Sequence, residues 1–491
     1  MINLYSNINK ILKTTVLSTT LNSVLWFIVL FSESTQALDT TITIHLRGVY
    51  ESKISLLPLT GANTIKPIAA VEMVKNGETT TIQVSKDYLP GEFVLRFDYK
   101  EKASSAPYPS EKRIIIYNQD LDLWVHPIYC NNGDSTWFQK DERENTAYSR
   151  FLKENAKQKA MLGLLQNFLL NYDDANSSFY NNGITEYEKR RSAFNQWITA
   201  QIKQYKTLFM SNMIGFQHIP KIDWNGNEVD RKQSLRDNYF EEMDFSDTLM
   251  LKTTGMKEWM DGFVNLYGEL ATNIALRDSL FTYAGKIAIE KAREGNPMVY
   301  GWMVDYFFKG YESFNIEKGI KMLQPYLNDP NCLTSKRQEI NKRLKGIETL
   351  VPGTIAPNII MQDMENKQFE LNTYSTEKSF ILLLFWSADC SHCKEMVGKL
   401  YPWFQQPEIQ NKLDIVAISV DEADTEVQSW KLKVKELNGW IHLRASEGLR
   451  SKVANDYYIL GVPVMILLNA KTKEIIALPE NEKQLIRFLL D

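Results

Sequence analysis

SFILLLFWSADCSHCK, residues 379–394, joins an apolar run to two cysteines three positions apart. The run from Ser379 to Trp386 predicts a buried strand that leads into a helix. Cys390 then lies at the helix N-terminus, where unpaired backbone N–H groups and the positive end of the helix dipole stabilise a thiolate. Cys393 lies on the same helix face within the first turn, close enough to form an internal disulfide. The pattern predicts a reversible redox pair, with Cys390 as nucleophile and Cys393 as resolving thiol.

A Cys-x-x-Cys pair can also be half of a zinc site. The other half is missing, because the chain has only four cysteines and five histidines, and the remaining cysteines, Cys130 and Cys332, are single and distant in sequence. We therefore expect no metal site. Cys130 and Cys332 either pair with each other or are separate buried apolar residues, and the sequence leaves both possibilities open.

The wider sequence resembles the thioredoxin superfamily, specifically the exported TlpA/ResA-like thiol:disulfide oxidoreductases. The resemblance covers residues from about 350 to 491 and rests on segments whose order and spacing agree with the family. These are Gly353-Thr354-Ile355-Ala356-Pro357, Phe385 to Lys394 with its Phe-Trp-x-x-x-Cys-x-x-Cys-Lys pattern, Ile415 to Glu422, and Gly461-Val462-Pro463. The resemblance implies a thioredoxin-like α/β domain with Cys390 and Cys393 as its catalytic pair and no cofactor.

Pro463 lies just before the apolar run Val464 to Leu468, where a proline would normally interrupt a strand. Together with the cysteine motif, the resemblance implies that the Val462–Pro463 bond is cis and lies beside the cysteines. This arrangement would leave the backbone of Val462 free to pair with an extended client segment. Val462 and Pro463 are therefore the predicted substrate-binding residues.

Several positions depart from the family pattern. Leu384 stands where many thioredoxins have a buried acid, and Met396 stands where the TlpA/ResA-like group often has a glutamate. Asp389 replaces the usual tryptophan before the first cysteine, and its charge opposes the thiolate that His392 favours. We expect Asp389, His392 and Trp386 to modulate the pair. A histidine between the cysteines suits an oxidant or isomerase, whereas the resemblance suggests reduction, so the direction stays open.

Residues 1–37 are expected to be an export signal. Lys10 and Lys13 precede the apolar segment from Val16 to Phe31, and Thr35-Gln36-Ala37 offers small residues for cleavage. The continuous apolar core is short for a spanning helix, which predicts a periplasmic or cell-envelope protein, with an inner-membrane anchor only if the signal is not cleaved. Such compartments tolerate disulfides.

The rest of the chain predicts a multidomain α+β protein. Short alternating runs separated by Asn76-Gly77 and Pro90-Gly91 indicate a small antiparallel β-sandwich over residues 38–135. Apolar residues at three- and four-residue spacing indicate a helical domain over residues 136–350. Strands alternating with helices, among them a helix from Glu447 to Tyr457, indicate the thioredoxin-like domain over residues 351–491.

The leading hypothesis is an exported thiol:disulfide oxidoreductase that acts on disulfide- or dithiol-containing client proteins and is recycled by a redox partner protein. A net charge of −4 gives no footprint for nucleic acid. Two alternatives remain. One is an envelope polypeptide-binding or chaperone-like protein with an auxiliary redox site. The other is a thiol peroxidase, which the missing threonine-rich pattern before the cysteine disfavours.

Overall fold

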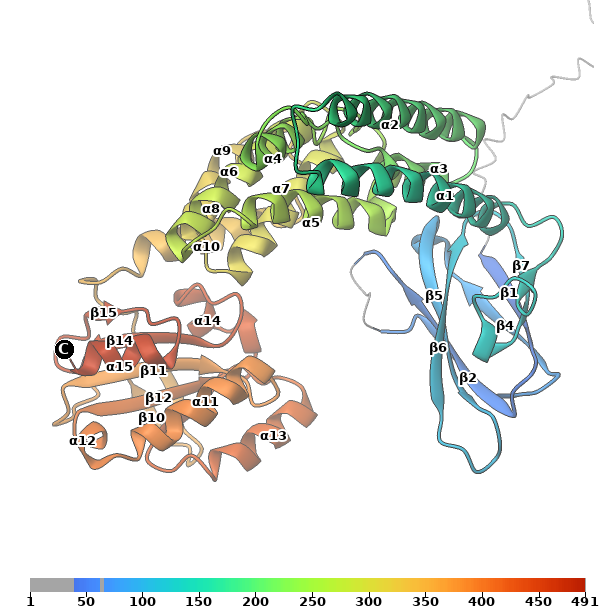
Figure 1. Ribbon diagram of the computed structural model, residues 1–491. Coiled ribbons are helices and arrows are strands. Elements are labelled where there is room, and N and C mark those ends of the chain that lie inside the picture. The colour runs from blue at the N-terminus through green and yellow to red at the C-terminus, as the bar shows by residue number, and fades with distance from the viewer. Residues whose placement is uncertain (1–38, 62–65, 491) are drawn as a thin grey trace, which may run out of the picture.

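The computed structural model describes residues 39–61 and 66–490, so the expected export signal lies outside the described residues. A sheet region, a helical region and a mixed region follow one another along the chain (Figure 1). The multidomain α+β class expected from the sequence is confirmed.

The N-terminal region consists of two sheets packed face to face. Its strands are β1 (Thr40–Leu46), β2 (Glu51–Pro58), β3 (Ala69–Lys75), β4 (Thr79–Val84), β5 (Gly91–Lys100), β6 (Tyr108–Ile116), β7 (Leu121–Val125) and β8 (Trp137–Phe138). The sheet orders are β4-β1-β7-β8 and β3-β2-β5-β6. Along β1, fully buried residues alternate with partly buried ones, as a strand with one face toward a core requires. Ile44, Leu56 and Leu95 bring both sheets into one apolar core.

One pairing in this sandwich differs from the antiparallel arrangement that we expected. β1 runs parallel to β7, with Ile44 opposite Leu123. Parallel neighbours need a long connection, and here most of the sandwich lies between the two strands. The turn signals in the sequence describe only neighbouring strands, so they could not reveal this pairing.

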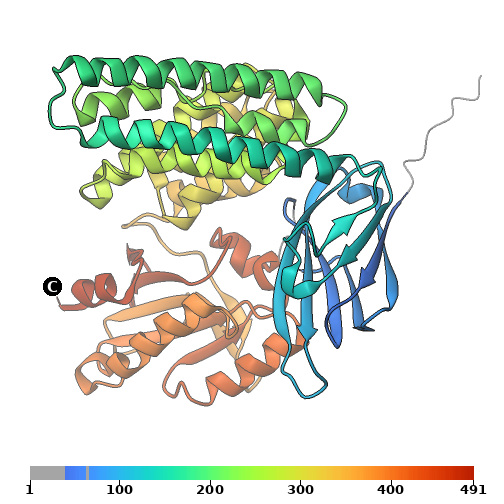
Figure 2. The same cartoon turned by 45° about the vertical axis from the view of Figure 1, so that its right-hand side comes forward.

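The middle region is helical. Its helices are α1 (Glu144–Asn171), α2 (Ser178–Gln204), α3 (Ser211–Ile214), α4 (Glu228–Asp237), α5 (Thr254–Gly268), α6 (Ile274–Arg293), α7 (Pro297–Ser313), α8 (Glu317–Met322), α9 (Gln324–Leu327) and α10 (Arg337–Thr349). The long helices α1 and α2 lie side by side, in green in Figure 2, and share a core that includes Phe151 and Phe194. A second core, with Met260 and Phe307, joins α5 to α10.

The C-terminal region is built on a sheet of order β13-β12-β11-β14-β15. Its strands are β11 (Phe380–Trp386), β12 (Leu413–Ser419), β13 (Ile441–Arg444), β14 (Val464–Asn469) and β15 (Ile475–Ala477), and β9 (Ile360–Gln362) pairs separately with β10 (Gln368–Glu370). Its helices are α11 (Ser391–Phe404), α12 (Pro407–Gln410), α13 (Asp424–Val434), α14 (Lys452–Asp456) and α15 (Glu482–Leu490). β11 is parallel to β12 and antiparallel to β14.

The central strand β11 is apolar throughout because both of its faces are covered. Leu382 and Leu384 belong to a core that includes α11, whereas Ile381 and Leu383 belong to a core that includes α14. Helices on both faces of the sheet make this region a layered α/β unit.

The helix that we expected from Glu447 to Tyr457 is broken. A 3₁₀ turn covers Gly448–Arg450, and α14 begins after Ser451. The backbone of Ser451 is extended, and its hydroxyl accepts the N–H of Ala454 at 3.3 Å. Serine favours such an N-cap, so it starts a new helix here.

The helical region contacts both of its neighbours, which lie on the same side of it (Figures 1 and 2). The buried carboxylate of Glu92 in β5 accepts the backbone N–H of Thr254 at 2.7 Å, where α5 begins. A separate contact joins the C-terminal region, where Lys342 of α10 bonds to Asn455 and Ile459. Among the described residues, no helix combines the length and the apolar composition needed to cross a membrane.

Leu383→Ala tests the position of β11 in the core. Leu383 is fully buried. The cavity left by the substitution should lower the free energy of unfolding of this region by about 2–5 kcal/mol. The urea dependence of Cys393 alkylation, followed by mass spectrometry, reports this unfolding because native Cys393 is buried. Leu432→Ala, at a site 65% exposed, is the matched control. Equal effects of the two substitutions would contradict the core position of Leu383.

Candidate active site

Cys390 is the N-cap residue of α11. Its backbone is extended, with φ of −76° and ψ of 123°, and its Sγ accepts the N–H of Cys393 at 3.2 Å. This N–H is one of the donors that a helix leaves without an internal partner. Cys390 is partly exposed, so its sulfur has both solvent access and a stabilising donor.

Cys393 lies one turn further along α11 and is completely buried. Burial raises the pKa of the Cys393 thiol, and its hydrogen bond with Cys390 and the nearby charge of Asp421 raise it further. The backbone N–H of Ser387 acts in the opposite direction. The two cysteines are free thiols that differ in exposure, with Cys390 partly exposed and Cys393 buried.

The segment that contains Pro463 lies beside Cys390. The Val462–Pro463 peptide is cis, as the resemblance implied, and Cys390 Sγ lies 3.7 Å from the carbonyl oxygen of Val462. Residues 72 positions apart in sequence therefore meet at the N-terminus of α11.

The remaining predicted site residues lie in different environments. His392 is exposed, and Asp389 is exposed with a carboxylate 3.5 Å from Lys394 Nζ. Trp386, the last residue of β11, is only 1% exposed and belongs to the core on the α11 side of the sheet. His392 and Asp389 therefore lie on the solvent-exposed side of the site, whereas Trp386 packs in the buried core that also contains Cys393.

Asp421 is a residue of this site that sequence analysis did not single out. It follows β12 by two positions and is 1% exposed. Its carboxylate accepts the Ser387 hydroxyl at 2.6 Å, the Ala388 N–H at 3.0 Å and the Ser419 hydroxyl at 2.7 Å. No local pattern in the sequence could have found it, since its place follows from strand pairing: β12 is the parallel neighbour of β11, and the carboxyl ends of such strands meet at one edge of a sheet.

The helical region holds the chain that leads to Val462. Lys342 Nζ donates to the Ile459 carbonyl at 2.9 Å and to Asn455 Oδ1 at 2.8 Å. Leu460 packs against the core shared by α5 to α10. Gly346 faces Tyr458 so closely that an added Cβ would lie 2.9 Å from the Tyr458 Cβ. The helical region is thus part of the support of the site.

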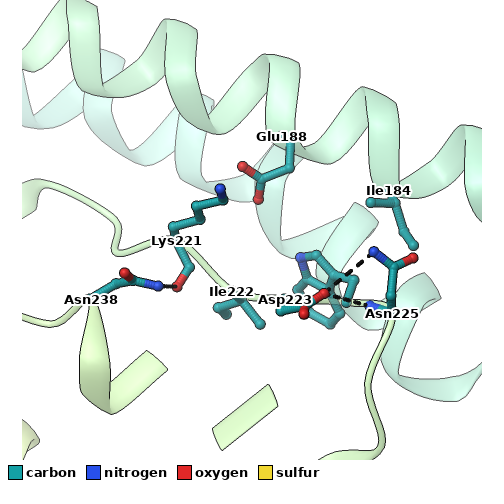
Figure 3. A pocket seen from close by; sticks show the side chains of 8 residues that line it. Ile184, Glu188, Lys221, Ile222, Asp223, Asn225 and Asn238 are labelled. Carbon is teal, nitrogen blue, oxygen red and sulfur yellow. Dashed lines mark hydrogen bonds between the residues drawn. The ribbon is translucent and has the colours of Figure 1, made fainter. Parts of the chain in front are cut away.

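Three other features bear on function, namely metal-binding groups, the remaining cysteines and a cavity in the helical region. Within residues 39–61 and 66–490, no group of three or more His, Cys, Asp or Glu side chains could hold a metal ion. Cys130 and Cys332 are both buried free thiols and do not pair with each other. A cavity of about 380 Å³, whose lining includes Glu188, Lys221 and Asn238, lies wholly within the helical region and apart from the cysteines (Figure 3).

Comparison with known proteins gives a consistent result. A family model described as thioredoxin-like matches residues 378–475, which include both cysteines and Pro463. The chain is 28% identical to the thiol-disulfide oxidoreductase ResA of Bacillus thuringiensis subsp. konkukian over 131 residues, 26% of this chain and 69% of that protein.

The chain is also similar to solved structures, among them a domain of a possible thiol-disulfide isomerase from Cytophaga hutchinsonii. It is 28% identical, and the match covers 29% of this chain and 92% of that one, with a TM-score of 0.25. A thioredoxin-like protein from Bacteroides caccae is 17% identical, with 55% of this chain and 97% of that one covered and a TM-score of 0.37.

Alkylation of the reduced protein should separate the two thiols. We expect iodoacetamide to modify Cys390 first near neutral pH, because Cys393 is buried and its pKa is raised. Modification of Cys393 should increase only at alkaline pH, where its thiol loses the proton. Peptide mass spectrometry over a pH series measures both rates. Faster reaction of Cys393 near neutral pH would reverse the two roles.

Lys342→Met tests the support that the helical region gives to the site. Methionine replaces the unbranched stem of Lys342 but lacks its ammonium group, so both hydrogen bonds to the segment before Val462 are lost. Losing them should cost about 1–3 kcal/mol locally. Hydrogen exchange of residues 455–463 should therefore become faster. Lys345→Met, at an exposed position of the same helix, is the control. Unchanged protection in Lys342→Met would mean that the segment is rigid without the helical region.

Proposed function

The C-terminal region of this chain is a thioredoxin-like thiol-disulfide oxidoreductase domain, and from this premise we propose that Cys390 and Cys393 exchange electrons with disulfides of client proteins. The observation that supports this proposal is the unequal placement of the two thiols. Cys390 is partly exposed at the N-terminus of α11, and Cys393 is buried within the first turn of the same helix.

Cys390 is the attacking group. The N–H of Cys393 and the positive end of the α11 dipole both stabilise a negative charge on Cys390 Sγ. When a client is reduced, the Cys390 thiolate attacks one sulfur of the client disulfide. A disulfide between Cys390 and the client forms, and the second client sulfur leaves as a thiolate.

Cys393 completes the exchange. Its sulfur attacks Cys390 Sγ, the internal disulfide forms, and the first client sulfur leaves. The client gains two electrons and the cysteine pair loses two. A redox partner protein then reduces the internal disulfide. The same steps in reverse order oxidise a client dithiol, and no bound cofactor is needed because the cysteines themselves hold the electrons.

The backbone of Val462 is the proposed client-binding edge. Its carbonyl oxygen is 3.7 Å from Cys390 Sγ, and its N–H has no hydrogen-bond partner among the described residues. An extended client segment could pair with these groups as an added strand. Such pairing would bring a client sulfur next to Cys390. His392 and Asp389, both exposed beside the cysteines, would then face the client.

The cycle belongs in a compartment that tolerates disulfides. The export signal expected at residues 1–37 supports a place in the periplasm or cell envelope. The reduction potential of the Cys390/Cys393 pair, measured against glutathione, decides whether the protein reduces, isomerises or oxidises its clients.

Trapping with single cysteine variants tests the proposed function. Cys393→Ser should accumulate disulfide-linked clients, because Cys390 still attacks but the thiol that releases the client is gone. Cys390→Ser should trap far fewer. Non-reducing electrophoresis, repeated after addition of reductant, measures the linked species. If both variants and the unmodified chain retain the same clients regardless of reductant, the sandwich and helices bind polypeptides and the redox site is auxiliary.

A further inference from the structure

The proposed cycle requires a proton to move at a buried sulfur. Cys393 must lose its proton when the internal disulfide forms and regain one when that disulfide opens. Cys393 is fully buried, so bulk water does not reach its sulfur directly. A neighbouring group that takes up and returns the proton would remove this obstacle.

Two positions where an acid could lie next to Cys393 hold apolar residues. Leu384 of β11 and Met396 of α11 are both buried in the same core as Cys393. Glu395, the nearest acid on α11, is exposed and bonds to Lys399 at 2.7 Å. Neither β11 nor α11 therefore places a carboxylate beside the Cys393 sulfur.

Asp421 reaches the cysteine from the adjacent strand. Ser387 links the two groups, because its hydroxyl donates to Asp421 Oδ1 at 2.6 Å and its backbone N–H faces the Cys393 sulfur. The second carboxylate oxygen accepts the Ser419 hydroxyl at 2.7 Å and the Ala388 N–H at 3.0 Å. The carboxylate is thus held by the turn between β11 and α11 and by the last residue of β12.

Few charged groups lie around Cys393 and Asp421. Cys390 and Asp421 are the titratable groups that raise the pKa of the Cys393 thiol, in addition to its burial. From β13, Arg444 bonds to the backbone carbonyl of Asp421 at 3.2 Å.

Other charged groups point outward. On the turn and α11, Asp389 pairs with Lys394 and His392 is exposed, whereas beyond Asp421 the exposed Glu422 bonds to Arg450. Asp421 is therefore the buried carboxylate whose charge acts on the Cys393 thiol.

We propose that Asp421 takes the proton from the Cys393 thiol as the internal disulfide forms and returns it when that disulfide opens. The proposal rests on the proposed function of the cysteine pair. In the forward step, the Cys393 S–H bond breaks and its proton passes by way of the Ser387 hydroxyl to Asp421. The Cys393 sulfur bonds to Cys390 Sγ, and the client sulfur leaves with the electron pair of the broken disulfide. The proton finally reaches solvent or the departing client thiolate.

An aromatic disulfide of nitrobenzoate, whose released thiolate is yellow, separates the two chemical steps. Attack by Cys390 releases one coloured thiolate, and closure by Cys393 releases the second. Cys393→Ser should show only the first release and so identifies the phases. Asp421→Asn should leave the first phase within about twofold and slow the second by about tenfold or more, as loss of a general base does.

The direction of the change in the second phase distinguishes proton transfer from a purely electrostatic role. The charge of Asp421 contributes to the raised pKa of Cys393, so its removal should let the Cys393 thiol ionise at lower pH. If charge were its only role, the second phase of Asp421→Asn would be faster than in the native chain. We expect it to be slower near neutral pH and to approach the native rate at alkaline pH, where the thiol ionises unaided.

Two further variants complete the test. Glu422→Gln makes the same chemical change at the exposed neighbouring residue and should leave both phases unaltered. Ser387→Ala removes the linking hydroxyl, keeps the backbone N–H and should slow the second phase, which tests the proposal even if Asp421→Asn does not fold. If the second phase of Asp421→Asn is as fast as that of the native chain, or faster, the role of Asp421 is overturned. If Asp421→Asn does not fold, the same result in Ser387→Ala overturns it. Absence of coloured release from the native chain would instead overturn the proposed function.

Discussion

The hydrogen bond from the Cys393 N–H to Cys390 Sγ is the contact on which the proposed thiol chemistry depends. It exists because α11 begins directly after the turn that follows β11, so the first thiol becomes the cap and the second lies inside the helix. One turn of helix therefore separates a sulfur with solvent access from one without it. In the proposed cycle, this difference in environment between two identical side chains sets the order of attack and release.

The sheet supports this arrangement through packing and hydrogen bonds. β11 is covered on both faces, and Asp421 at the end of β12 accepts hydrogen bonds from Ser387 and Ala388 in the turn. The turn is thereby tied to a neighbouring strand as well as to its own helix. A carboxylate with several donors can remain buried, since hydrogen bonds replace its lost hydration. The same residue thus combines support of the turn with a charge near the inner thiol.

The helical region extends this support across the boundary between regions. Lys342 and Gly346 of α10 contact the segment that leads to Val462, and Leu460 packs into the helical core. The sandwich is attached at another helix, where Glu92 accepts the backbone N–H of Thr254 at the start of α5. A change in the helical region could therefore reach the sulfur chemistry through the backbone of residues 458–462, without touching either cysteine.

The sequence by itself determined the elements whose cause is local. Through their resemblance to the thioredoxin superfamily, the apolar run to Trp386, the cysteine spacing and the position of Pro463 implied a thioredoxin-like domain. The junction of strand and helix also predicted Cys390 at the helix N-terminus and Cys393 within the first turn, because a strand followed closely by a helix leaves little freedom over one turn. Tertiary structure alone decided the parallel pairing of β1 with β7, the contact of Asp421 with the turn and that of Lys342 with Ile459. These contacts join segments far apart along the chain, and no local periodicity encodes them, since they arise only when packing of whole elements brings their ends together.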